Sequence, residues 1–468
     1  MRAAHRVEQI RRAEASLAAT LPAGTLMQRA ATALATVCAA RLPAVYGAQV
    51  VLLVGGGDNG ADALWAGSRL SRRGAQVRAL LAGQPAADAL AAFLASGGTL
   101  GSREDLEDAD LVVDGLVGIG GHGPLRGEAA ELAAAALGPD VVAVDLPSGV
   151  DADTGAVDGT CVHAAVTVTF GTLKTGLLVG EGRRRAGTVH VADIGLGPHL
   201  PAADVEVLSS VDAALLLPRA GSQDDKYSRG VVGVMAGSAG FPGAAVLAVG
   251  GAVRAGAGMV RFAGSRDIVA PVLARWPEAV AAGGRVQAWV VGPGLGTEAV
   301  DTVHALLRED VPVVVDADAL TICAEHSDWV RQRTAPTLLT PHDREFARFG
   351  VDVGPDRVQA ARTLAADLGS TVLLKGDAVV VADPDGAVRI NDTGVPALAT
   401  AGSGDVLAGA AGALLAAGLR PLDAGSLAAH LHGRAGRLAS RGAPIAATDL
   451  LAAWAEAVRE TSAGTLPA

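Results

Sequence analysis

The sequence predicts an α/β protein of two domains, each built on a mostly parallel sheet covered by helices. Three observations predict this class. The chain has 468 residues, which exceeds one ordinary core, since domains usually hold roughly 100 to 200 residues. Half of the residues are hydrophobic, 61 are Gly and only 3% are aromatic, so the apolar content lies in short runs of Ala, Val and Leu. Those runs alternate between strand-like and helix-like patterns, which is typical of βαβ units.

The first domain is predicted from the pattern of residues 1–215. Residues 1–41 alternate charged and Ala/Leu-rich positions at helical spacing, so one or two helices are expected there. Four β-rich runs follow, at 50–54, 111–113, 141–144 and 166–170, separated by Ala/Leu-rich helical stretches. This alternation predicts a parallel sheet.

The second domain is predicted to span residues 221–468. Pro198, Pro201, Pro218 and Gly221 interrupt the pattern and place the junction near residue 220. A new series of strand candidates then begins, at 231–236, 288–291, 313–315, 337–339, 371–374 and 379–381. The ligands of such open sheets bind beyond the carboxyl ends of the strands, so the motifs of both domains are expected there.

Charge and hydropathy exclude several classes of protein. The net charge of −11 argues against a nucleic-acid partner. The longest nearly uncharged stretches fall short of the ~20 apolar residues that a bilayer span needs. The charged N-terminus lacks the apolar segment of a signal peptide, so we expect a cytoplasmic protein without a membrane partner. We also expect it to be a homo-oligomer.

Lysine and cysteine usage narrow the candidates further. Lys occurs only at positions 174, 226 and 375, while the other 35 of the 38 basic residues are Arg. A compact ammonium fits a phosphate or a reacting oxygen as a point charge, so the three lysines are site candidates unless their retention is chance. Cys38, Cys161 and Cys323 are widely spaced and odd in number, which argues against a disulfide framework or a zinc site.

Polar residues follow three of the predicted strands in the first domain. A turn of three glycines precedes Asp58, and a helical stretch starts at about residue 63; backbone amides in such a turn can approach a phosphate, although many structural turns look similar. Asp114 ends the second run, and Asp145 with Ser148 follows the third. With Asn59, these oxygens suit a monovalent or other hard cation beside an anionic ligand. The alternative is that each Asp only caps a helix.

The segment from about 50 to 176 resembles the YjeF N-terminal domain, the NAD(P)H-hydrate epimerase family, which has a Rossmann-like three-layer α/β/α fold. The likeness rests on the glycine-rich turn, the loop VVDGLVGIGGHGP, the strand end VVAVDLPSG and the segment TFGTLKTG. It implies that Asp145 lies at the reacting ring, that Lys174 lies close by, and that Asn59, Asp114 and Ser148 bind potassium. The hydrate-binding residues that it implies are Asp58, Asn59, Gly60, Ala61, Asp62, Gly118, Ile119, Gly120, Gly121, His122, Gly123, Pro124, Asp145 and Lys174.

The sequence departs from that family's pattern in the glycine-rich turn. Asp58 stands where Asn is usual, and Ala61 and Ala63 stand where Gly is usual. If Ala61 had to adopt a positive φ, the turn would carry strain on the order of 1 kcal/mol.

The segment NDTGVPALATAGSGDVLAGAAGALLAAG, from residue 391 to 418, is the most specific signal in the second domain. A Gly/Ser turn runs into Asp405 and then into a long apolar stretch. Its amides would form an anion hole at a helix N-terminus, with Asp405 held where phosphoryl transfer needs a base. A helix that is merely capped by Ser403 or Asp405 is the alternative. Lys375 and Gly376, GPGLG at 292–296, DADAL at 316–320 and TPHDREF at 340–346, which presents His342, follow other strands.

Together with KYSRG at 226–230, AGSAGFPGAA at 236–245 and RAGAGMVR at 254–261, these segments resemble the YjeF C-terminal domain, the ADP- or ATP-dependent NAD(P)H-hydrate dehydratase family of ribokinase-like fold. The match covers nearly all of residues 221–455. It implies that Ala257, Gly294, His342 and Asp405 contact the hydrate. It implies nucleotide binding by Lys375, Gly376, Asp377, Ala378, Val379, Gly402, Ser403 and Gly404.

The two resemblances imply one repair pathway. Asp405 would remove the hydroxyl proton of a nicotinamide ring hydrated at C6, the hydroxyl would attack the terminal phosphate of ADP or ATP, and phosphate would then leave to restore the dihydronicotinamide. Magnesium would assist. The hydrates of NADH and NADPH are called NADHX and NADPHX. Only their S forms are the expected substrates of the dehydratase, which explains an epimerase on the same chain. Both ADP and ATP stay open as the phosphoryl donor, and both NADHX and NADPHX stay open as the preferred hydrate.

Two other functions are compatible with parts of the sequence. One is a small-molecule kinase of the hydroxyethylthiazole or hydroxymethylpyrimidine type, since that superfamily shares the Gly-x-Gly-Asp anion hole; such a kinase has no evident use for a dinucleotide epimerase. In the other, the first domain is a non-catalytic binding or scaffold module. The presence of Asn59, Asp114, Asp145 and Ser148 argues against it.

Overall fold

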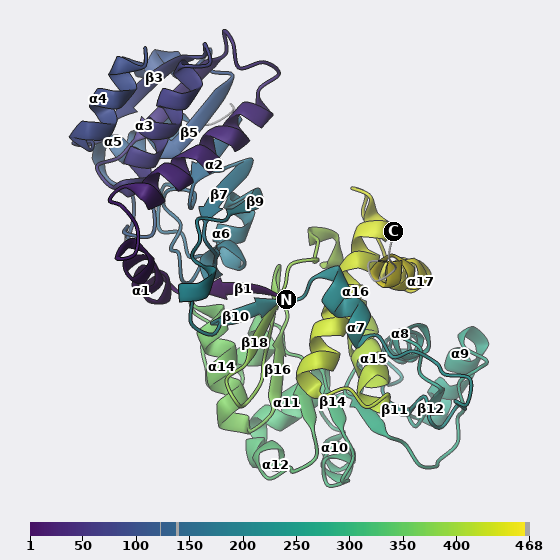
Figure 1. Cartoon of the computed structure of the whole chain (residues 1–468). Coiled ribbons are helices and arrows are strands. Elements are labelled where there is room, and N and C mark those ends of the chain that lie inside the picture. Colours follow the sequence, from purple (N-terminus) through teal and green to yellow (C-terminus); the bar gives the residue numbers. More distant parts are fainter. Residues whose placement is uncertain (122, 137–139, 464–468) are drawn as a thin grey trace. The chain divides into compact units, whose positions relative to one another are not determined.

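The computed structural model describes residues 1–121, 123–136 and 140–463. The chain divides into two compact units, Ala3–Val205 and Glu206–Ala468, the second of which also includes Met1–Arg2. Each unit contains a sheet with helices packed on it, as Figure 1 shows. The predicted α/β class is therefore confirmed.

The sheet of the first unit has parallel strands in the order β4-β3-β2-β5-β6-β7-β9. The strands are β2 (Gln49–Val54), β3 (Gln76–Leu81), β4 (Thr99–Leu100), β5 (Leu111–Gly115), β6 (Val141–Val144), β7 (Val166–Phe170) and β9 (Thr188–Ala192). The helices are α1 (Val7–Ala18), α2 (Thr25–Arg41), α3 (Asp58–Ser71), α4 (Ala87–Ala95), α5 (Gly127–Ala135) and α6 (Gly180–Arg185), with short 3-10 turns η1 (Arg103–Leu106), η2 (Thr175–Leu177) and η3 (Gly197–His199).

Successive residues of β2 face opposite sides of this sheet, because side chains alternate along a strand. Val50, Leu52 and Val54 pack in a core with residues of α2, α3 and α4, whereas Val51 and Leu53 pack in a second core with residues of α5. Both faces of the sheet are thus covered, which gives three layers. A strand buried on both faces reads as a continuous apolar run, and this explains why β2 is evident in the sequence.

The sheet of the second unit runs in the order β12-β11-β13-β14-β15-β16-β17-β18-β10. β17 is antiparallel to both of its neighbours, and the other pairs are parallel. The strands are β10 (Val205–Val207), β11 (Val231–Met235), β12 (Met259–Phe262), β13 (Ala288–Val291), β14 (Val313–Val315), β15 (Thr337–Leu339), β16 (Thr371–Leu374), β17 (Val379–Ala382) and β18 (Val388–Asn391).

The helices of the second unit follow most of its strands. They are α7 (Ser210–Leu216), α8 (Pro242–Arg254), α9 (Arg266–Arg275), α10 (Val300–Leu307), α11 (Ala317–Glu325), α12 (Ser327–Arg331), α13 (Asp343–Ala347), α14 (Arg357–Leu368), α15 (Ser403–Ala416), α16 (Pro421–Ser440) and α17 (Ala447–Ala463), with a 3-10 turn η4 (Pro396–Leu398).

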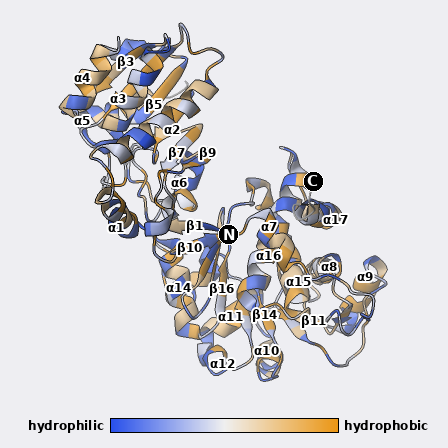
Figure 2. Cartoon of the chain, viewed as in Figure 1, coloured by the Kyte–Doolittle hydropathy of each residue, from blue (hydrophilic) through white to orange (hydrophobic). Residues whose placement is uncertain are grey.

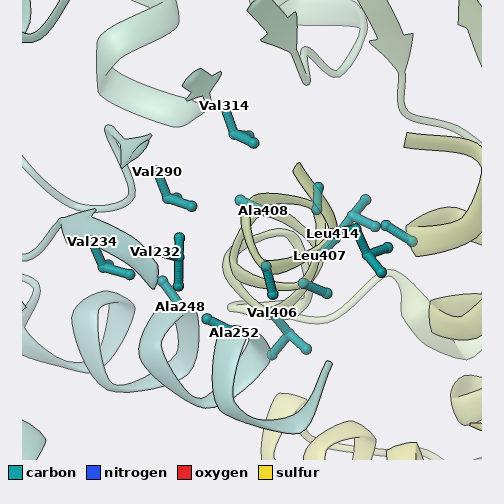
Figure 3. Close-up of a cluster of buried hydrophobic side chains, with 14 of the residues drawn as sticks. Val232, Val234, Ala248, Ala252, Val290, Val314, Val406, Leu407, Ala408 and Leu414 are labelled. Carbon is teal, nitrogen blue, oxygen red and sulfur yellow. The ribbon is translucent and has the colours of Figure 1, made fainter. Parts of the chain in front are cut away.

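The core of the second unit is centred on α15, which packs against the strands and against α8. In Figure 3, Val232, Val290 and Val314 of the sheet face this helix. The two helices meet backbone to backbone: a Cβ added to Gly409 would lie 1.9 Å from the carbonyl oxygen of Ala248. Glycine is required at this contact, because any side chain would force the helices apart. The close contact holds the N-terminus of α15 at the edge of the sheet.

Most predicted strands are confirmed, and several strands escaped prediction. Those at 141–144, 166–170, 288–291, 313–315, 337–339 and 371–374 match the structure residue for residue. β3, β9, β12 and β18 were missed because polar residues interrupt their apolar pattern. The expectation of helices alone in residues 1–41 is wrong at its start, where β1 (Arg2–His5) forms a strand; its residues Ala4 and His5 pair with β8 (Leu173–Lys174).

No helix among the described residues is both long and apolar enough to cross a membrane. Figure 2 shows hydrophilic residues interspersed along most of the helices. This is the pattern of helices that pack one side on a sheet and expose the other to water.

Candidate functional site

The glycine-rich turn of the first unit is shorter than the sequence predicts. Helix α3 begins at Asp58 and not near residue 63, so Asn59, Gly60, Ala61 and Asp62 form its first turn. The φ angle of Ala61 is not positive, because among the described non-glycine residues only Asp145, Ala317 and Arg441 have positive φ. The strain considered for Ala61 is therefore absent, and alanine is compatible with this helical position.

Asp114 and Ser148 are in direct contact at the carboxyl edge of the first sheet. The Oγ of Ser148 donates to Oδ1 of Asp114 at 2.6 Å, and the backbone N–H of Ser148 donates to Oδ2 at 2.8 Å. The Ser148 hydroxyl also lies 2.9 Å from the N–H and 3.1 Å from the carbonyl oxygen of Val117. Asp114 is fully buried. Burial raises its pKa to about 6, although the hydrogen bonds from Ser148 act to lower it.

Asn59 completes this group from helix α3. Its Nδ2 donates to the carbonyl oxygen of Val144 at the end of β6. Its Oδ1 lies so close to Gly118 that a Cβ added there would be 2.1 Å away. Gly118 follows Val117, which contacts Ser148, so the three residues predicted to share a cation do gather around one loop. The remaining residues of that loop, Ile119, Gly120, Gly121, Gly123 and Pro124, lie beyond β5, whereas His122 lies outside the described residues.

Asp145 and Lys174 form a buried ion pair next to the Asp114 group. Asp145 follows β6 with a φ of 68°, a left-handed conformation that Asp tolerates better than most residues. The Lys174 ammonium donates to Oδ1 of Asp145, to Oγ1 of Thr169 at 2.9 Å and to the carbonyl oxygen of Phe170 at 3.1 Å. Thr169 itself donates to the same Asp145 oxygen at 3.0 Å. The side chain of Lys174 is only 1% exposed, so its geometry is fixed from several sides.

A cleft of about 460 Å³ opens beside the start of helix α3. Asp58 and Asp62 of α3, Arg11 and Glu14 of α1, and Phe170 of β7 contribute to its wall. The rest of the lining is mainly apolar, from α1, α2 and the segment between them, with Ile194. Glu14 and Arg11 are site residues that the sequence-based reasoning missed. One signal was available: Glu14 falls at helical spacing between the buried Ile10 and Leu17, where an apolar residue is expected.

Two carboxyl groups of this cleft, those of Asp62 and Glu14, have raised pKa values. Burial raises the pKa of Asp62 well above its usual range, and Asp145, Asp58 and Glu14 raise it further. Burial also raises the pKa of Glu14; the Lys174 charge lowers it, while Asp145 and Asp58 raise it. Asp62 is 5% exposed, and its Oδ1 has no hydrogen-bond partner. A buried polar atom without a partner is costly, so it marks a place where a ligand could bond.

In the second unit, Asp405 lies in the first turn of α15, as the sequence predicts. Gly402 precedes the helix with a φ of 84°, and the N–H groups of the first turn are free of helical partners. Ser403 is held by His432, whose Nε2 lies 3.0 Å from the Ser403 carbonyl oxygen and 3.2 Å from its Oγ. Burial of His432 lowers its pKa to about 4, so this neighbour of the turn is uncharged at neutral pH.

Lys375 lies between the turn before α15 and two carboxylates, those of Asp316 and Glu345. Its Nζ donates to Oδ1 of Asp316 at 2.8 Å and lies 3.6 Å from Oε2 of Glu345. Thr340 also donates to Oδ1 of Asp316, at 2.8 Å. A Cβ added to Gly404 would lie 3.5 Å from the Lys375 ammonium, so the lysine faces the turn before α15. This confirms that the motifs after β14, β16 and η4 meet at one edge of the sheet.

The electrostatics of this edge favour an uncharged Asp405 below neutrality. Burial raises the pKa of Asp405 to about 7, and the negative charge of Asp316 adds to the rise, whereas Lys375 opposes it. Although burial acts to lower the pKa of Lys375, Asp316 and Glu345 raise it. The lysine is therefore charged at neutral pH, and Asp405 titrates in the range in which a general base works best.

The other predicted residues of this unit are spread around the same edge. His342 caps helix α13, where its Nδ1 accepts from the N–H groups of Arg344 and Glu345, and its side chain is 49% exposed. Gly294 lies in the turn after β13, against Phe241 and Ala244. Ala257 lies between α8 and β12, where it packs on the apolar core. Gly376, Asp377 and Ala378 form the turn between β16 and β17, and Val379 begins β17.

The carboxylates at this edge do not form a ready metal cage. Among the residues that the structure describes, no group of three or more His, Cys, Asp or Glu side chains is placed to hold a metal ion. Asp318 instead accepts from the N–H of Gly296 at 2.9 Å. Asp316 and Glu345 lie in the motifs DADAL and TPHDREF, and the sequence alone assigns no role to either acidic residue.

Both units match families of known proteins. Residues 23–176 match the family described as YjeF-related protein N-terminus, and residues 232–455 match the family described as NAD(P)H-hydrate dehydratase. Proteins named bifunctional NAD(P)H-hydrate repair enzyme Nnr are similar over most of the chain. The one from Mycobacterium leprae is 51% identical over 457 residues, which are 94% of this chain and 94% of that protein. The one from Salinibacter ruber is 38% identical over 92% of this chain and 91% of that protein.

Solved structures match the second unit. The ADP/ATP-dependent NAD(P)H-hydrate dehydratase from Bacillus subtilis, crystallised with ATP and Mg²⁺, is 30% identical with a TM-score of 0.51, over 55% of this chain and 99% of that chain. A ribokinase-like superfamily protein from Enterococcus faecalis is 23% identical with a TM-score of 0.51, over 56% of this chain and 98% of that chain. The ribokinase-like fold predicted for the second domain is thereby confirmed.

Proposed function

The chain belongs to the family of bifunctional NAD(P)H-hydrate repair enzymes, and from this membership we propose which residues carry its two reactions. The enzyme epimerises the R and S hydrates of NADH and NADPH, and it dehydrates the S hydrate with ADP or ATP. We assign epimerisation to residues 1–215 and dehydration to residues 221–468. Each of these segments contains its own sheet and its own polar cluster at the carboxyl edge of that sheet.

The proposed epimerase site is centred on Asp145. The buried Lys174 holds the Asp145 carboxylate in one orientation, so the carboxylate can face the hydrated ring without rotating. The first turn of α3, residues 58–62, and the loop 118–124 flank it and would hold the rest of the hydrate. Backbone N–H groups at the start of a helix favour the negative charge of a pyrophosphate.

The proposed potassium site consists of Asn59, Asp114 and Ser148. The oxygens of these residues are of the hard type that alkali cations prefer. Asp114 is fully buried, and its hydrogen bonds come from uncharged donors, the hydroxyl and backbone N–H groups of Ser148 and Leu116. A buried carboxylate without a counter-charge is costly, so the residues fit a cation. Potassium bound there would balance the charge of Asp114 next to the substrate's pyrophosphate.

The proposed dehydratase base is Asp405. Its carboxylate takes the proton of the C6 hydroxyl as that oxygen attacks the terminal phosphorus of ADP or ATP, and the bond from this phosphorus to AMP or ADP breaks. The C6–O bond then breaks with loss of phosphate, and a proton leaves C5, which restores the ring double bond. The products are NAD(P)H, phosphate and AMP or ADP. Ala257, Gly294 and His342 are the proposed contacts of the hydrate.

The proposed nucleotide site lies between the turn before α15 and the turn after β16. The N–H groups of Gly402, Ser403 and Gly404 would donate hydrogen bonds to the phosphoryl oxygens, while Lys375 adds a positive charge. The segment 376–379 would hold the rest of the nucleotide. Because no described group of side chains forms a metal cage, we expect Mg²⁺ to be held mainly by phosphate oxygens and water, as is usual for this ion. When bound, it neutralises phosphate charge.

The observation that supports the dehydratase assignment best is the position of Asp405, a carboxyl with a pKa of about 7 at a helix N-terminus beside a charged lysine. The test incubates pure protein with mixed R and S hydrate and either ADP or ATP, and follows the absorbance of the reduced nicotinamide together with free phosphate. We expect equal amounts of NAD(P)H and phosphate. A phosphorylated product that accumulates in their place would indicate a small-molecule kinase.

Several expectations about the whole protein stay predictions. These are a homo-oligomeric assembly, a cytoplasmic location, and the absence of nucleic-acid and membrane partners. Light scattering of the purified protein would test the first of them directly.

A further inference from the structure

The cleft beside the start of α3, near Asp145, has a wall with three carboxyl groups. Asp58, Asp62 and Glu14 line it within one cavity of about 460 Å³, together with a mainly apolar wall. These carboxyl groups offer hydrogen-bond partners to a ring with hydroxyl and amide groups, whereas the backbone N–H groups at the start of α3 suit the pyrophosphate. The unpartnered Oδ1 of Asp62, on a side chain that is 5% exposed, indicates that this acidic wall is built to bond a ligand.

Glu14 is the member of this group that the assignments above leave without a role. It lies on α1, whose buried residues Ile10 and Leu17 fix the helix against the core, so its carboxyl is directed to the cleft by the packing of its own helix. The charged groups around it are Arg11 on the same helix, Asp58 and Asp62 on α3, Asp145 after β6, and Lys174 on β8. These surroundings are those of the proposed epimerase centre.

We propose that Glu14 is the general acid of epimerisation, and that it protonates the C6 hydroxyl of a hydrated nicotinamide bound in this cleft. This inference rests on the proposed assignment of epimerisation to the first unit. The C6–O bond breaks, and the oxygen leaves as water with the proton of Glu14. The lone pair of the ring nitrogen forms a C6=N1 double bond, which gives a cationic ring. Water then adds to the opposite face of C6 and loses a proton to solvent, and the Glu14 carboxylate takes a proton back from solvent.

The charges around the cleft suit each stage of this sequence. A carboxyl whose pKa is raised by burial, as that of Glu14 is, keeps its proton at a pH at which an exposed carboxyl has lost it. Once the hydroxyl has left, the ring carries a positive charge, and the neighbouring Asp145 and Asp58 stabilise it electrostatically. The apolar wall from α1 and α2 would pack against the face of the ring.

The test compares Glu14→Gln with wild-type full-length protein on pure R hydrate, with ADP present so that each S hydrate formed is dehydrated to NAD(P)H. The variant keeps the size of the side chain and loses the transferable proton. We expect the kcat of epimerisation to fall by roughly 10²- to 10⁴-fold with a KM that changes much less. We also expect the variant to lose the decline in rate that the wild type shows as the pH rises through the pKa of Glu14. Glu8→Gln, on an exposed position of the same helix, is the matched control and should equal the wild type.

Isotope transfer provides a second measurement. In H₂¹⁸O, each enzymatic epimerisation that breaks the C6–O bond should place one ¹⁸O atom on C6. If the S hydrate kept its original oxygen, or if Glu14→Gln epimerised at the wild-type rate, the proposal would be wrong. If Glu14→Gln does not fold, Glu14→Asp is the variant to measure. It keeps a carboxyl group, so the epimerisation rate should still decline at high pH, but with a shifted midpoint. An unchanged midpoint would contradict the role of Glu14.

Failure of the underlying assignment has a different signature. If wild-type protein consumed R hydrate only at the spontaneous rate while it dehydrated S hydrate, the first unit would not be an epimerase at all. Normal wild-type epimerisation with an unaffected Glu14→Gln variant would reject the role of Glu14 alone.

Discussion

The ammonium of Lys375 lies 2.8 Å from Oδ1 of Asp316 and thereby joins the turn after β16 to the residue that follows β14. The same Asp316 oxygen accepts from Thr340, so the carboxylate is held from two sides. A lysine ammonium has three donors, and the side chain of Lys375 is 19% exposed. It therefore has donors left for a phosphate that arrives at the turn before α15.

The first prediction is that Lys375→Ala raises the KM for ADP or ATP more than the KM for the hydrate. Loss of a charge-assisted hydrogen bond costs about 1.5–3 kcal/mol, which is on the order of 10- to 100-fold in affinity. Initial rates at varied nucleotide and varied hydrate measure the two constants. Arg266→Ala, at an exposed position of α9, is the control, and an unchanged nucleotide dependence in Lys375→Ala would remove this lysine from the site.

The second prediction is that single substitutions separate the two activities, because the two proposed sites, at Asp145 and at Asp405, lie at the edges of different sheets. Asp405→Asn keeps the side chain's size but removes the charge that accepts the hydroxyl proton. It should reduce dehydration by on the order of 10²- to 10⁴-fold and leave the interconversion of R and S hydrates intact. Chromatography of the two hydrates measures the interconversion directly.

Asp145→Ala is the mirror of that experiment. It should leave dehydration of pure S hydrate fast and reduce consumption of the R hydrate to its spontaneous rate. If a correctly folded Asp405→Asn stopped epimerisation, or if Asp145→Ala stopped dehydration of S hydrate, one shared active site would have to replace the two.

The third prediction concerns pH. Asp405 has to be ionised to act as a base, so kcat/KM of dehydration should rise as the pH increases through about 7. Asp316 raises the pKa of Asp405, and it also pairs with the Lys375 ammonium that lowers it. Asp316→Asn removes the negative charge that raises the pKa of Asp405, and it also frees the Lys375 ammonium from its pair. Both changes lower the pKa of Asp405, so the midpoint of the pH profile should move to lower pH. Asp301→Asn, at an exposed position of α10, is the control and should leave the midpoint of the pH profile unchanged. If Asp316→Asn also left the midpoint unchanged, the proposed electrostatic effect of Asp316 on Asp405 would be wrong.

The fourth prediction is that epimerisation depends on potassium. Without a cation, the buried Asp114 carboxylate would lie uncompensated beside the substrate's pyrophosphate. Rates in potassium buffer should therefore exceed those in sodium-only buffer, and Asp114→Ala should weaken this difference. Asp108→Ala, at an exposed position before β5, should preserve it. Equal wild-type rates in the two buffers would argue against the site.

The fifth prediction tests the packing that positions Asp405. Gly409→Ala would place a methyl group 1.9 Å from the Ala248 carbonyl oxygen, so α15 and α8 would have to separate. Such overpacking typically costs about 1–3 kcal/mol of stability. Gly243→Ala, in α8 with nothing within 4 Å of the new atom, should be neutral or stabilising by up to about 1 kcal/mol. Denaturant unfolding of both variants measures the contrast.

The sequence predicts the buried strands well because apolar residues cover both of their faces. It fails for β3 and β18, where Arg78 and Arg389 interrupt the apolar pattern. At the sites, strand-end carboxylates such as Asp114 and Asp145 are found because parallel strands bring their ends together. Glu14 is missed because its approach to the cleft depends on how α1 packs against the sheet, and this long-range contact leaves only a weak local signal.

The burial of β2 on both faces affects what determines the register of strand pairing in the first sheet. A slip of one residue would exchange Leu52 and Leu53 between the two cores and expose neither of them, so hydrophobicity alone discriminates weakly against the wrong alignment. The polar bonds at the carboxyl ends discriminate strongly, because Asn59 reaches the carbonyl of Val144 and Ser148 reaches Asp114 in one alignment only. The side chains proposed for potassium would thus also favour the correct alignment of the strands, and a misaligned sheet would lack the proposed cation site.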